Sequence, residues 1–388
     1  MQELDKKIFT TLFFSVFTAV LGVGIVVPLL PVYAHDLGAS GLYIAAIFGS
    51  FSFSRTIFLP YFGRLSDKKG RKVFISTGLF FYAIISICFL FAKDVETLII
   101  VRLFQGVGSA MIMPVTQAYI GDITPPGKEG FIMGAFNMAV FMGLSAGPLI
   151  GGVINDKLSL NASFITMGSL SATGFLVSLF GLPPTKTEKK NHSEKIPAPW
   201  HKIFLDKQIA GFFAYRFSYA LCIGVSWGFL PLLADMKFNL SSSSIGFLVM
   251  TGVAISGLLH IPMGYMADKI NKTLMVITGG LIAGAAFLLF TRANNINDLF
   301  WGNILFGIGG GISMPALMAL AVVKGRESCA MGSVMGYITM AHSFGMLIGA
   351  FIAGMIMDIS YLGQAFLAGA WAMAAGVILF YISTLQKK

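Results

Sequence analysis

The chain has 388 residues, of which 56% are hydrophobic and only 11% are charged. Soluble domains carry about 25% charged residues, so this composition excludes an ordinary soluble protein. The formal net charge is +10, but the cations stand in short tracts between apolar runs, which favours a membrane surface over nucleic acid as their partner. Three cysteines, Cys88, Cys222 and Cys329, lie far apart and match neither a disulfide framework nor a metal site.

Twelve apolar segments are long enough to cross a bilayer, which requires about 20 residues per helix. None of them shows the alternating pattern of a transmembrane β-strand. The first segment is too long for the core of a cleavable signal peptide and is predicted to be retained. We therefore expect an all-α membrane protein. The predicted spans are residues 8–33, 42–61, 73–92, 97–120, 131–154, 163–182, 209–233, 245–265, 273–291, 298–322, 331–356 and 362–384.

A polar segment divides these spans into two groups of six. Pro183 and Pro184 end the sixth span because proline cannot continue a helix, and lysines are frequent from there to Gln208. We expect a first six-helix bundle over residues 1–182, a linker over 183–208 and a second bundle over 209–388.

The cations predict the orientation of the chain. If both termini lie inside the cell, 20 of the 27 lysines and arginines fall in cytoplasmic segments and 4 fall in outer loops. Positive charge collects on the cytoplasmic side of multi-pass proteins. We therefore expect a protein of the inner (cytoplasmic) membrane with both termini and the linker in the cytoplasm.

The two groups of spans resemble each other in sequence. Residues 63–68 read Gly-Arg-Leu-Ser-Asp-Lys and residues 264–269 read Gly-Tyr-Met-Ala-Asp-Lys, an offset of 201. Residues 106–108 match residues 307–309 at the same offset. Several matches at one offset indicate a duplication. Two six-helix halves in parallel, with the solute site between them at mid-membrane, are a known plan of secondary transporters.

Three segments resemble motifs of the major facilitator superfamily, and the likeness extends over essentially the whole chain. The loop over residues 63–72 resembles the family's signature loop between spans two and three, and residues 102–108, with Gln105 and Gly106, resemble its second motif. Residues 143–152 resemble the glycine–proline motif of the exchanger branch, which includes drug and tetracycline exporters. The resemblance implies two pseudo-symmetric six-helix bundles and transport by alternating access, with neither an enzyme activity nor a cofactor.

In that family the signature loop latches the cytoplasmic side in the outward-open state. The corresponding residues here are Gly63, Asp67, Gly70, Arg71 and Asp122, with Asp268 in the second half. Asp67 is an anion that the N-terminus of the eleventh span would attract, and Arg71 is expected to pair with Asp122. Gly63 and Gly70 permit a tight turn and a close helix approach. The alternative is a cationic loop that only fixes orientation.

Small residues follow one face of the fifth span. Gly143, Gly147 and Gly151 are four residues apart, a spacing that lets two helices approach closely. Pro148 is expected to bend the helix. The resemblance to exchangers favours efflux as the direction of transport. The alternative is ordinary helix packing, which makes the same contacts.

Four ionisable residues lie inside predicted spans, where charge is costly and usually faces a cavity or a partner. They are Arg55, Arg102, Arg216 and His260, whereas no Asp or Glu stands near the middle of any span. Buried cations without carboxylates are expected to favour an anionic or zwitterionic solute, because the arginine fork binds planar anions. The alternatives are that Arg55 and Arg216 reach an interface or bond backbone carbonyls, and that His260 is a packing residue.

The sequence departs from several proton-coupled exporters at Ala19, where they carry an acid. Proton coupling through His260, whose imidazole type titrates near neutral pH, and uncoupled transport are both open at this point. We expect a monomeric secondary transporter in the lipid bilayer that moves a small molecule. Efflux exchange is the first hypothesis, and passage of a small anionic metabolite is the second. A membrane enzyme is disfavoured because the five histidines are scattered and form no catalytic cluster. Direct ATP drive is disfavoured because no P-loop is present. A transport-like fold that only senses or scaffolds is a third hypothesis.

Overall fold

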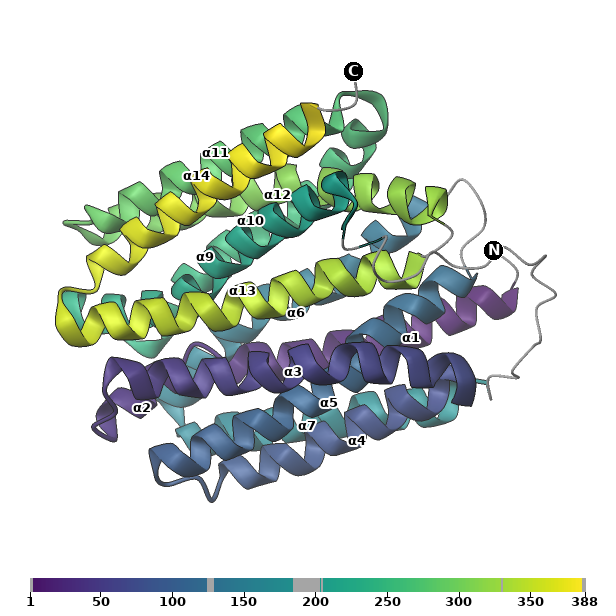
Figure 1. Cartoon of the computed structure of the whole chain (residues 1–388). Helices are drawn as coiled ribbons and strands as arrows, with labels where there is room; N and C mark the ends of the chain where they lie inside the picture. The colour runs from purple at the N-terminus through teal and green to yellow at the C-terminus, as the bar shows by residue number, and fades with distance from the viewer. Residues whose placement is uncertain (1–2, 124–128, 184–202, 204, 329–330, 386–388) are drawn as a thin grey trace.

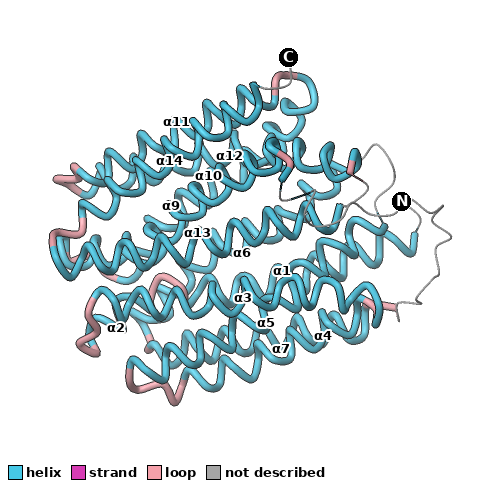
Figure 2. Tube along the Cα trace, in the orientation of Figure 1, coloured by secondary structure: helices cyan, strands magenta, loops and turns pink. Residues whose placement is uncertain are grey.

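The computed structural model describes residues 3–123, 129–183, 203, 205–328 and 331–385. Within these residues the regular structure is entirely α-helical (Figure 2). Twelve stretches of the described chain are long and apolar enough to span a membrane, which confirms the predicted number. The first helix begins and the last helix ends at the same end of the bundle (Figure 1). We call this the terminal end and the opposite one the far end.

Each predicted span corresponds to one observed span. The first half contains α1 (Glu3–Val26), α2 (Leu30–Asp36), α3 (Gly41–Lys69), α4 (Arg71–Phe89), α5 (Val95–Ile123), α6 (Glu129–Lys157) and α7 (Leu160–Gly181). The second half contains α9 (Lys207–Phe238), α10 (Ser242–Lys269), α11 (Lys272–Thr291), α12 (Ile296–Glu327), α13 (Met331–Ile359) and α14 (Gly363–Leu385). α1 and α2 together form the first span, and Pro28 stands in the break between them because it has no N–H to donate.

The second span is longer than the sequence predicts. The apolar run ends near residue 61, but α3 continues to Lys69, so most of the predicted signature loop is helical. Gly63 therefore lies inside a helix and makes no turn. The chain turns at Gly70, whose φ of +92° is a conformation that glycine adopts without strain. Hydropathy misses the last turns of α3 because it registers contact with lipid, whereas a polar helix can continue beyond the apolar layer.

Each half is built from the same set of helix contacts. In the first half, α1 packs on α6 and α7, α5 packs on α3 and α4, and α4 packs on α7. In the second half, α9 packs on α13 and α14, α12 packs on α10 and α11, and α11 packs on α14. The second set is the first with each helix replaced by its counterpart six spans later. The fold is therefore two pseudo-symmetric six-helix bundles, as the duplication predicts.

The repeat extends to single hydrogen bonds. Arg102 Nε of α5 donates to the carbonyl of Ile47 in α3 at 3.3 Å. Asn303 Nδ2 of α12 donates to the carbonyl of Leu248 in α10 at 2.5 Å. Both members of the second pair stand 201 residues after those of the first, which is the offset of the sequence repeat.

Glycines hold the same helix pairs at backbone contact distance. A Cβ at Gly106 of α5 would overlap the backbone of Phe51 in α3, and a Cβ at Gly307 of α12 would overlap that of Gly252 in α10. Again the two contacts are 201 residues apart. Close backbone approach gives the van der Waals contact that stabilises helix pairs in lipid, where the hydrophobic effect adds little between helices.

We predict that Gly106→Ala destabilises the protein by about 1–3 kcal/mol, because the added methyl group has no space between α5 and α3. Gly121→Ala is the matched control in the same helix, since nothing lies within 4 Å of the position of its Cβ. The control is expected to be unchanged or more stable by up to about 1 kcal/mol. Thermal unfolding of the purified protein in detergent measures both variants. Equal midpoints for the two would contradict the packing described.

Candidate transport site

The two halves meet along two helix pairs, α6 with α10 and α3 with α13. In Figure 1, α13 and α3 lie side by side across the middle of the molecule. The two pairs are related by the internal repeat, because α10 is the counterpart of α3 and α13 is the counterpart of α6. A site between the halves is therefore enclosed by one helix pair on each of two sides.

Carboxylates join both helix pairs at the far end. Asp358 of α13 accepts hydrogen bonds from the backbone N–H groups of Gly41 (2.7 Å) and Leu42 (2.9 Å) at the start of α3. Asp156 of α6 accepts one from the N–H of Ser243 (2.9 Å) at the start of α10. The first N–H groups of a helix lack partners within it and carry the positive end of its dipole. Each carboxylate thus caps a helix of the opposite half.

Glycines show where the halves are in contact and where they are apart. On α6, a Cβ at Gly152 would overlap the backbone of Ser242 in α10, whereas nothing lies within 4 Å of a Cβ at Gly134. These glycines are 18 residues apart, which is five turns or about 27 Å along one face of the helix. Gly152 is at the far end of α6 and Gly134 is at its terminal end.

The other interface helices repeat this arrangement. Gly354 of α13 lies against the backbone of α3, and Gly246 of α10 lies against that of α6. Eighteen residues toward the terminal end of each helix stand Gly336 and Gly264, and neither has a neighbour from the other half within 4 Å of its Cβ position. Along these described faces the halves touch at the far end and separate toward the terminal end.

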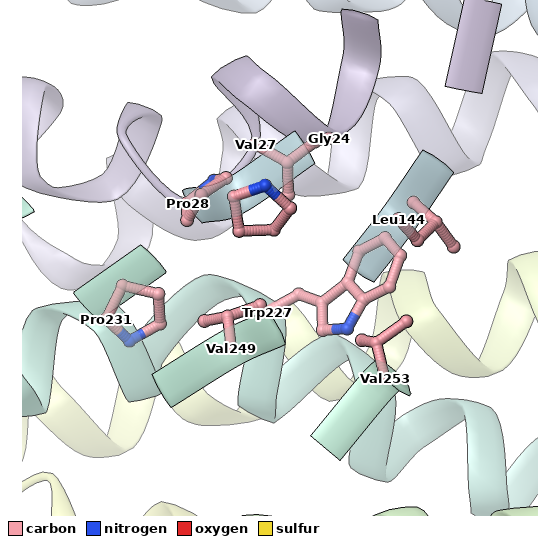
Figure 3. A pocket seen from close by; sticks show the side chains of 9 residues that line it. Gly24, Val27, Pro28, Leu144, Trp227, Pro231, Val249 and Val253 are labelled. Carbon is pink, nitrogen blue, oxygen red and sulfur yellow. The ribbon is translucent and has the colours of Figure 1, made fainter. Parts of the chain in front are cut away.

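A narrow apolar hollow with a cavity volume of about 20 Å³ lies between the halves and is partly open. Its walls come from the first span and α6 of one half and from α9 and α10 of the other. Trp227 of α9 lies between Leu144 of α6 and Val253 of α10 (Figure 3). Gly24 and Pro148 also line the hollow. The lining is apolar, and in this conformation the hollow is far smaller than a ligand pocket, so a bound molecule would need the halves to move apart here.

The glycine–proline motif holds α6 between two partners. A Cβ at Gly143 would lie 2.8 Å from the backbone N of Leu21 in α1, and one at Gly147 would lie 2.7 Å from the Cα of Gly24. The carbonyl of Pro148, the next residue, faces α10. The motif therefore sets α6 against α1 of its own half and against α10 of the other half at one depth.

Arg102 and Gln105 are enclosed within the first half. Arg102 is only 3% exposed, and its Nη1 donates to Gln105 Oε1 at 2.6 Å. The guanidinium carbon lies 4.5 Å from the centre of the Phe51 ring. These contacts satisfy the guanidinium between α3 and α5 and give Arg102 a packing role in this conformation.

Arg55 and Arg216 come from opposite halves and repel each other electrostatically. Arg55 Nε is fully enclosed and has no hydrogen-bond partner among the described residues. Arg216 Nη1 contacts only the sulfur of Met314, at 2.6 Å, and a thioether is a weak acceptor. Among the described side chains, the ion pairs involve neither arginine. His342 of α13 belongs with the two arginines, because both interact electrostatically with its imidazole ring. Its Nδ1 is enclosed and has no hydrogen-bond partner among the described residues.

His260 is held by packing. Its Nδ1 lies 2.8 Å from the carbonyl oxygen of Ser256 in the same helix. Its ring lies 4.2 Å, centre to centre, from the ring of Phe141 in α6. The side chain is buried and takes part in the contact between the halves, as the packing alternative predicts.

The predicted latch at the terminal end is described only in part. Arg71 Nη1 donates to Ser66 Oγ at 2.6 Å. The side chains of Asp67 and Asp122 lie outside the described residues, so their pairing stays a prediction. Nothing lies within 4 Å of the Cβ position of Gly63, so the close approach expected there is absent in this conformation. Asp268, at the matching position of α10, is exposed.

Sequence reasoning missed three of these groups. Asp156 and Asp358 carry a usable signal, because they stand 202 residues apart, close to the offset of the repeat. His342 carries none, since it is a single histidine in an apolar span and only the packing of α13 on α3 and α9 brings it to the two arginines.

Comparisons with known proteins agree with this architecture. The family model described as Major Facilitator Superfamily matches residues 12–323 and 212–388. An uncharacterised MFS-type transporter of Methanocaldococcus jannaschii is 31% identical over 385 residues, which cover 98% of this chain and 99% of that protein. The quinolone resistance protein NorA of Staphylococcus aureus is 26% identical over 393 residues and covers 97% and 96%.

Among solved structures, the human organic anion transporter MFSD10 superposes with a TM-score of 0.76 at 17% identity, over 97% of this chain and 99% of that one. A likeness at this identity shows the fold alone. Two six-helix halves, a hollow between them and a family match over nearly the whole sequence lead to one conclusion. The chain belongs to the major facilitator superfamily, whose members are membrane transporters and not enzymes.

Proposed function

We propose that this chain is an efflux exchanger that exports small molecules from the cell, by alternating access to a site between its two halves. The efflux direction is supported by relatives named for quinolone resistance and multidrug resistance. The observation that carries the mechanism is the contrast along three of the four interface helices, α6, α10 and α13. Faces that touch the other half at the far end are apart five turns away at the terminal end.

The opposite state follows from rocking one half against the other. When the far end opens, Gly152 and its counterparts leave the other half, and Gly134, Gly264 and Gly336 approach it. Small residues at these positions leave room for that approach. The cation bias of the loops supports a cytoplasmic location for the terminal end. The conformation described is then open to the side from which an exporter takes its substrate.

The second candidate is the passage of a small anionic metabolite. Arg55 and Arg216 favour it, because both are cationic, come from opposite halves and lack a carboxylate partner among the described residues. Both candidates use the same alternating movement, and the solute gradients set the direction.

Accumulation of a quinolone in cells tests the efflux proposal. Cells deprived of their own exporters are expected to hold at least twofold less quinolone when they express this chain. Unchanged accumulation of a quinolone and of a panel of other drugs would contradict the efflux proposal. Such a result would not contradict alternating access, which cysteine labelling tests independently.

A matched pair of glycine variants tests the movement. Gly134→Leu is expected to preserve the present conformation, because nothing lies near its Cβ, and to block closure of the terminal end. Gly152→Leu places the same side chain five turns away, where it overlaps α10, and is expected to open the far end. In a background where Cys88, Cys222 and Cys329 are replaced by Ser, Val253→Cys provides a single cysteine in the hollow. Its labelling by an impermeant thiol reagent measures access from each side.

The two variants are expected to change labelling in opposite directions. Gly134→Leu leaves the cysteine reactive from the terminal side only, and Gly152→Leu raises its reactivity from the far side. Identical labelling patterns in both variants and in the parent would contradict alternating access about this site. Chain amounts and thermal midpoints check that both variants fold.

The two capping carboxylates are expected to stabilise closure of the far end. Loss of a helix cap costs about 0.5–2 kcal/mol, so the double variant Asp156→Ala, Asp358→Ala loses about 1–4 kcal/mol and is expected to raise the far-open population at least about 5-fold. Labelling of the same cysteine from the far side measures the shift. Glu96→Ala is the control, since it removes an exposed carboxylate at this end from within one half. An equal effect of the control would show that net charge, and not capping, is responsible.

A further inference from the structure

Three cationic or proton-binding side chains converge near the middle of the bundle. Arg55 comes from α3 of the first half, and Arg216 and His342 come from α9 and α13 of the second half. α13 packs on both α3 and α9, and α9 also touches α3. Gly49 of α3 lies against Leu347 of α13, and Gly345 of α13 lies against Phe217 of α9. Each of the three side chains stands within about two turns of one of these contacts, so all three lie at a similar depth where the two halves meet.

This cluster is unfavourable as it stands. Like charges repel, and charge within a membrane protein normally has a partner of opposite sign. Here Arg55 Nε and His342 Nδ1 are enclosed without hydrogen-bond partners, and Arg216 has only a thioether sulfur. An enclosed polar atom that makes no hydrogen bond is destabilising, because it has lost its contacts with water and gained none in return. An anion bound among these groups would supply both the missing charge and the missing acceptors.

The internal repeat does not account for the cluster. The offsets that relate the helices of the two halves place Ser256 opposite Arg55, Val16 opposite Arg216 and Val140 opposite His342. Each of the three residues thus has an uncharged counterpart in the other half, so the helix arrangement that the halves share does not require a charge at these positions. The three groups are additions to a repeated frame, which favours a role in binding over a role in folding.

The apolar hollow lies on the same face of α9 as Arg216. Trp227 follows Arg216 by 11 residues, which is three turns or about 16 Å along one face. The cluster lies toward the terminal end and the hollow lies toward the far end. A molecule that contacts both must carry an anionic group at one end and an apolar body at the other.

We propose that Arg55, Arg216 and His342 bind the oxyanion group of an amphipathic organic acid, whose apolar body extends toward Trp227. The inference rests on the proposed function and names the substrate class of that site. Each guanidinium presents parallel N–H donors that fit a carboxylate or a phosphate monoester. The site needs both halves, because Arg55 belongs to one half and the other two groups belong to the second.

Binding to the purified full chain in nanodiscs of neutral lipid tests this site without requiring transport. The ligands are 1-naphthoate, 1-naphthyl phosphate and the uncharged 1-naphthamide, which share one apolar body. The parent protein is expected to bind at least one of the two acids 10-fold or more tightly than the amide. The two acids distinguish a carboxylate site from a phosphate site. Equal affinity for acids and amide, including no affinity for any of them, would overturn the proposal.

Variants then assign the residues. Arg55→Gln and Arg216→Gln are each expected to weaken acid binding at least 10-fold and to change amide binding less than twofold, while His342→Gln has a smaller effect in the same direction. Arg55→Lys is expected to retain part of the preference, because it keeps the charge and loses the fork. Arg292→Gln, at an exposed loop position, is the control. An unchanged acid-to-amide ratio in folded Arg55→Gln would also overturn the proposal.

The two proposals can fail separately. If acids bind as expected and the glycine variants do not alter access, the site stands and the rocking mechanism falls. If access alternates and the parent shows no preference for acids, the mechanism stands and the substrate class falls.

Discussion

Hydrocarbon provides no hydrogen bonds, so each polar group inside the spans must find its partner within the protein. The structure follows this constraint at most positions. Arg102 donates to a carbonyl of α3 and to Gln105, and Asn303 repeats the first of these contacts in the other half. His260 has the carbonyl of Ser256. Among the described residues, seven enclosed side-chain atoms lack a hydrogen-bond partner, and five of them are hydroxyl oxygens. The other two are nitrogens of Arg55 and His342, which are informative because these two side chains can carry a positive charge.

Much of the fold can be predicted because the sequence carries two strong signals, each contained in short segments of chain. Apolar runs of about 20 residues identify the spans, and the recurrence of residues 63–68 at 264–269 identifies the duplication. What the sequence does not show is the register between the halves. Asp358 reaches Gly41 across 317 residues, and no local pattern encodes such a contact. The same limit explains why His342 has no signal, since its meaning depends on which helices α13 packs against.

Close packing and movement depend on the same residue type in this protein. Gly106 and Gly307 are in permanent contact inside their halves, where a methyl group would overlap backbone. Gly134 and Gly336 are the same residue type in helices of the same kind, but among the described residues they have no contact with the other half in this conformation. A glycine in a membrane helix therefore does not by itself indicate a fixed interface. The distinction lies in whether its partner belongs to the same half, and that is a property of the fold and not of the local sequence.

The position of the cations suggests how binding and movement are coupled. A ligand shifts a conformational equilibrium only by its difference in affinity for the two states. Repulsion between Arg55 and Arg216 rises as the halves approach at the depth of these residues, so an empty site opposes closure around it. An anion between the two guanidiniums reverses the sign of that interaction, and the gain is largest when both halves contact it. Binding of the anion would then favour the closed intermediate that lies between the two open states. No other group would be needed to couple binding to this closure.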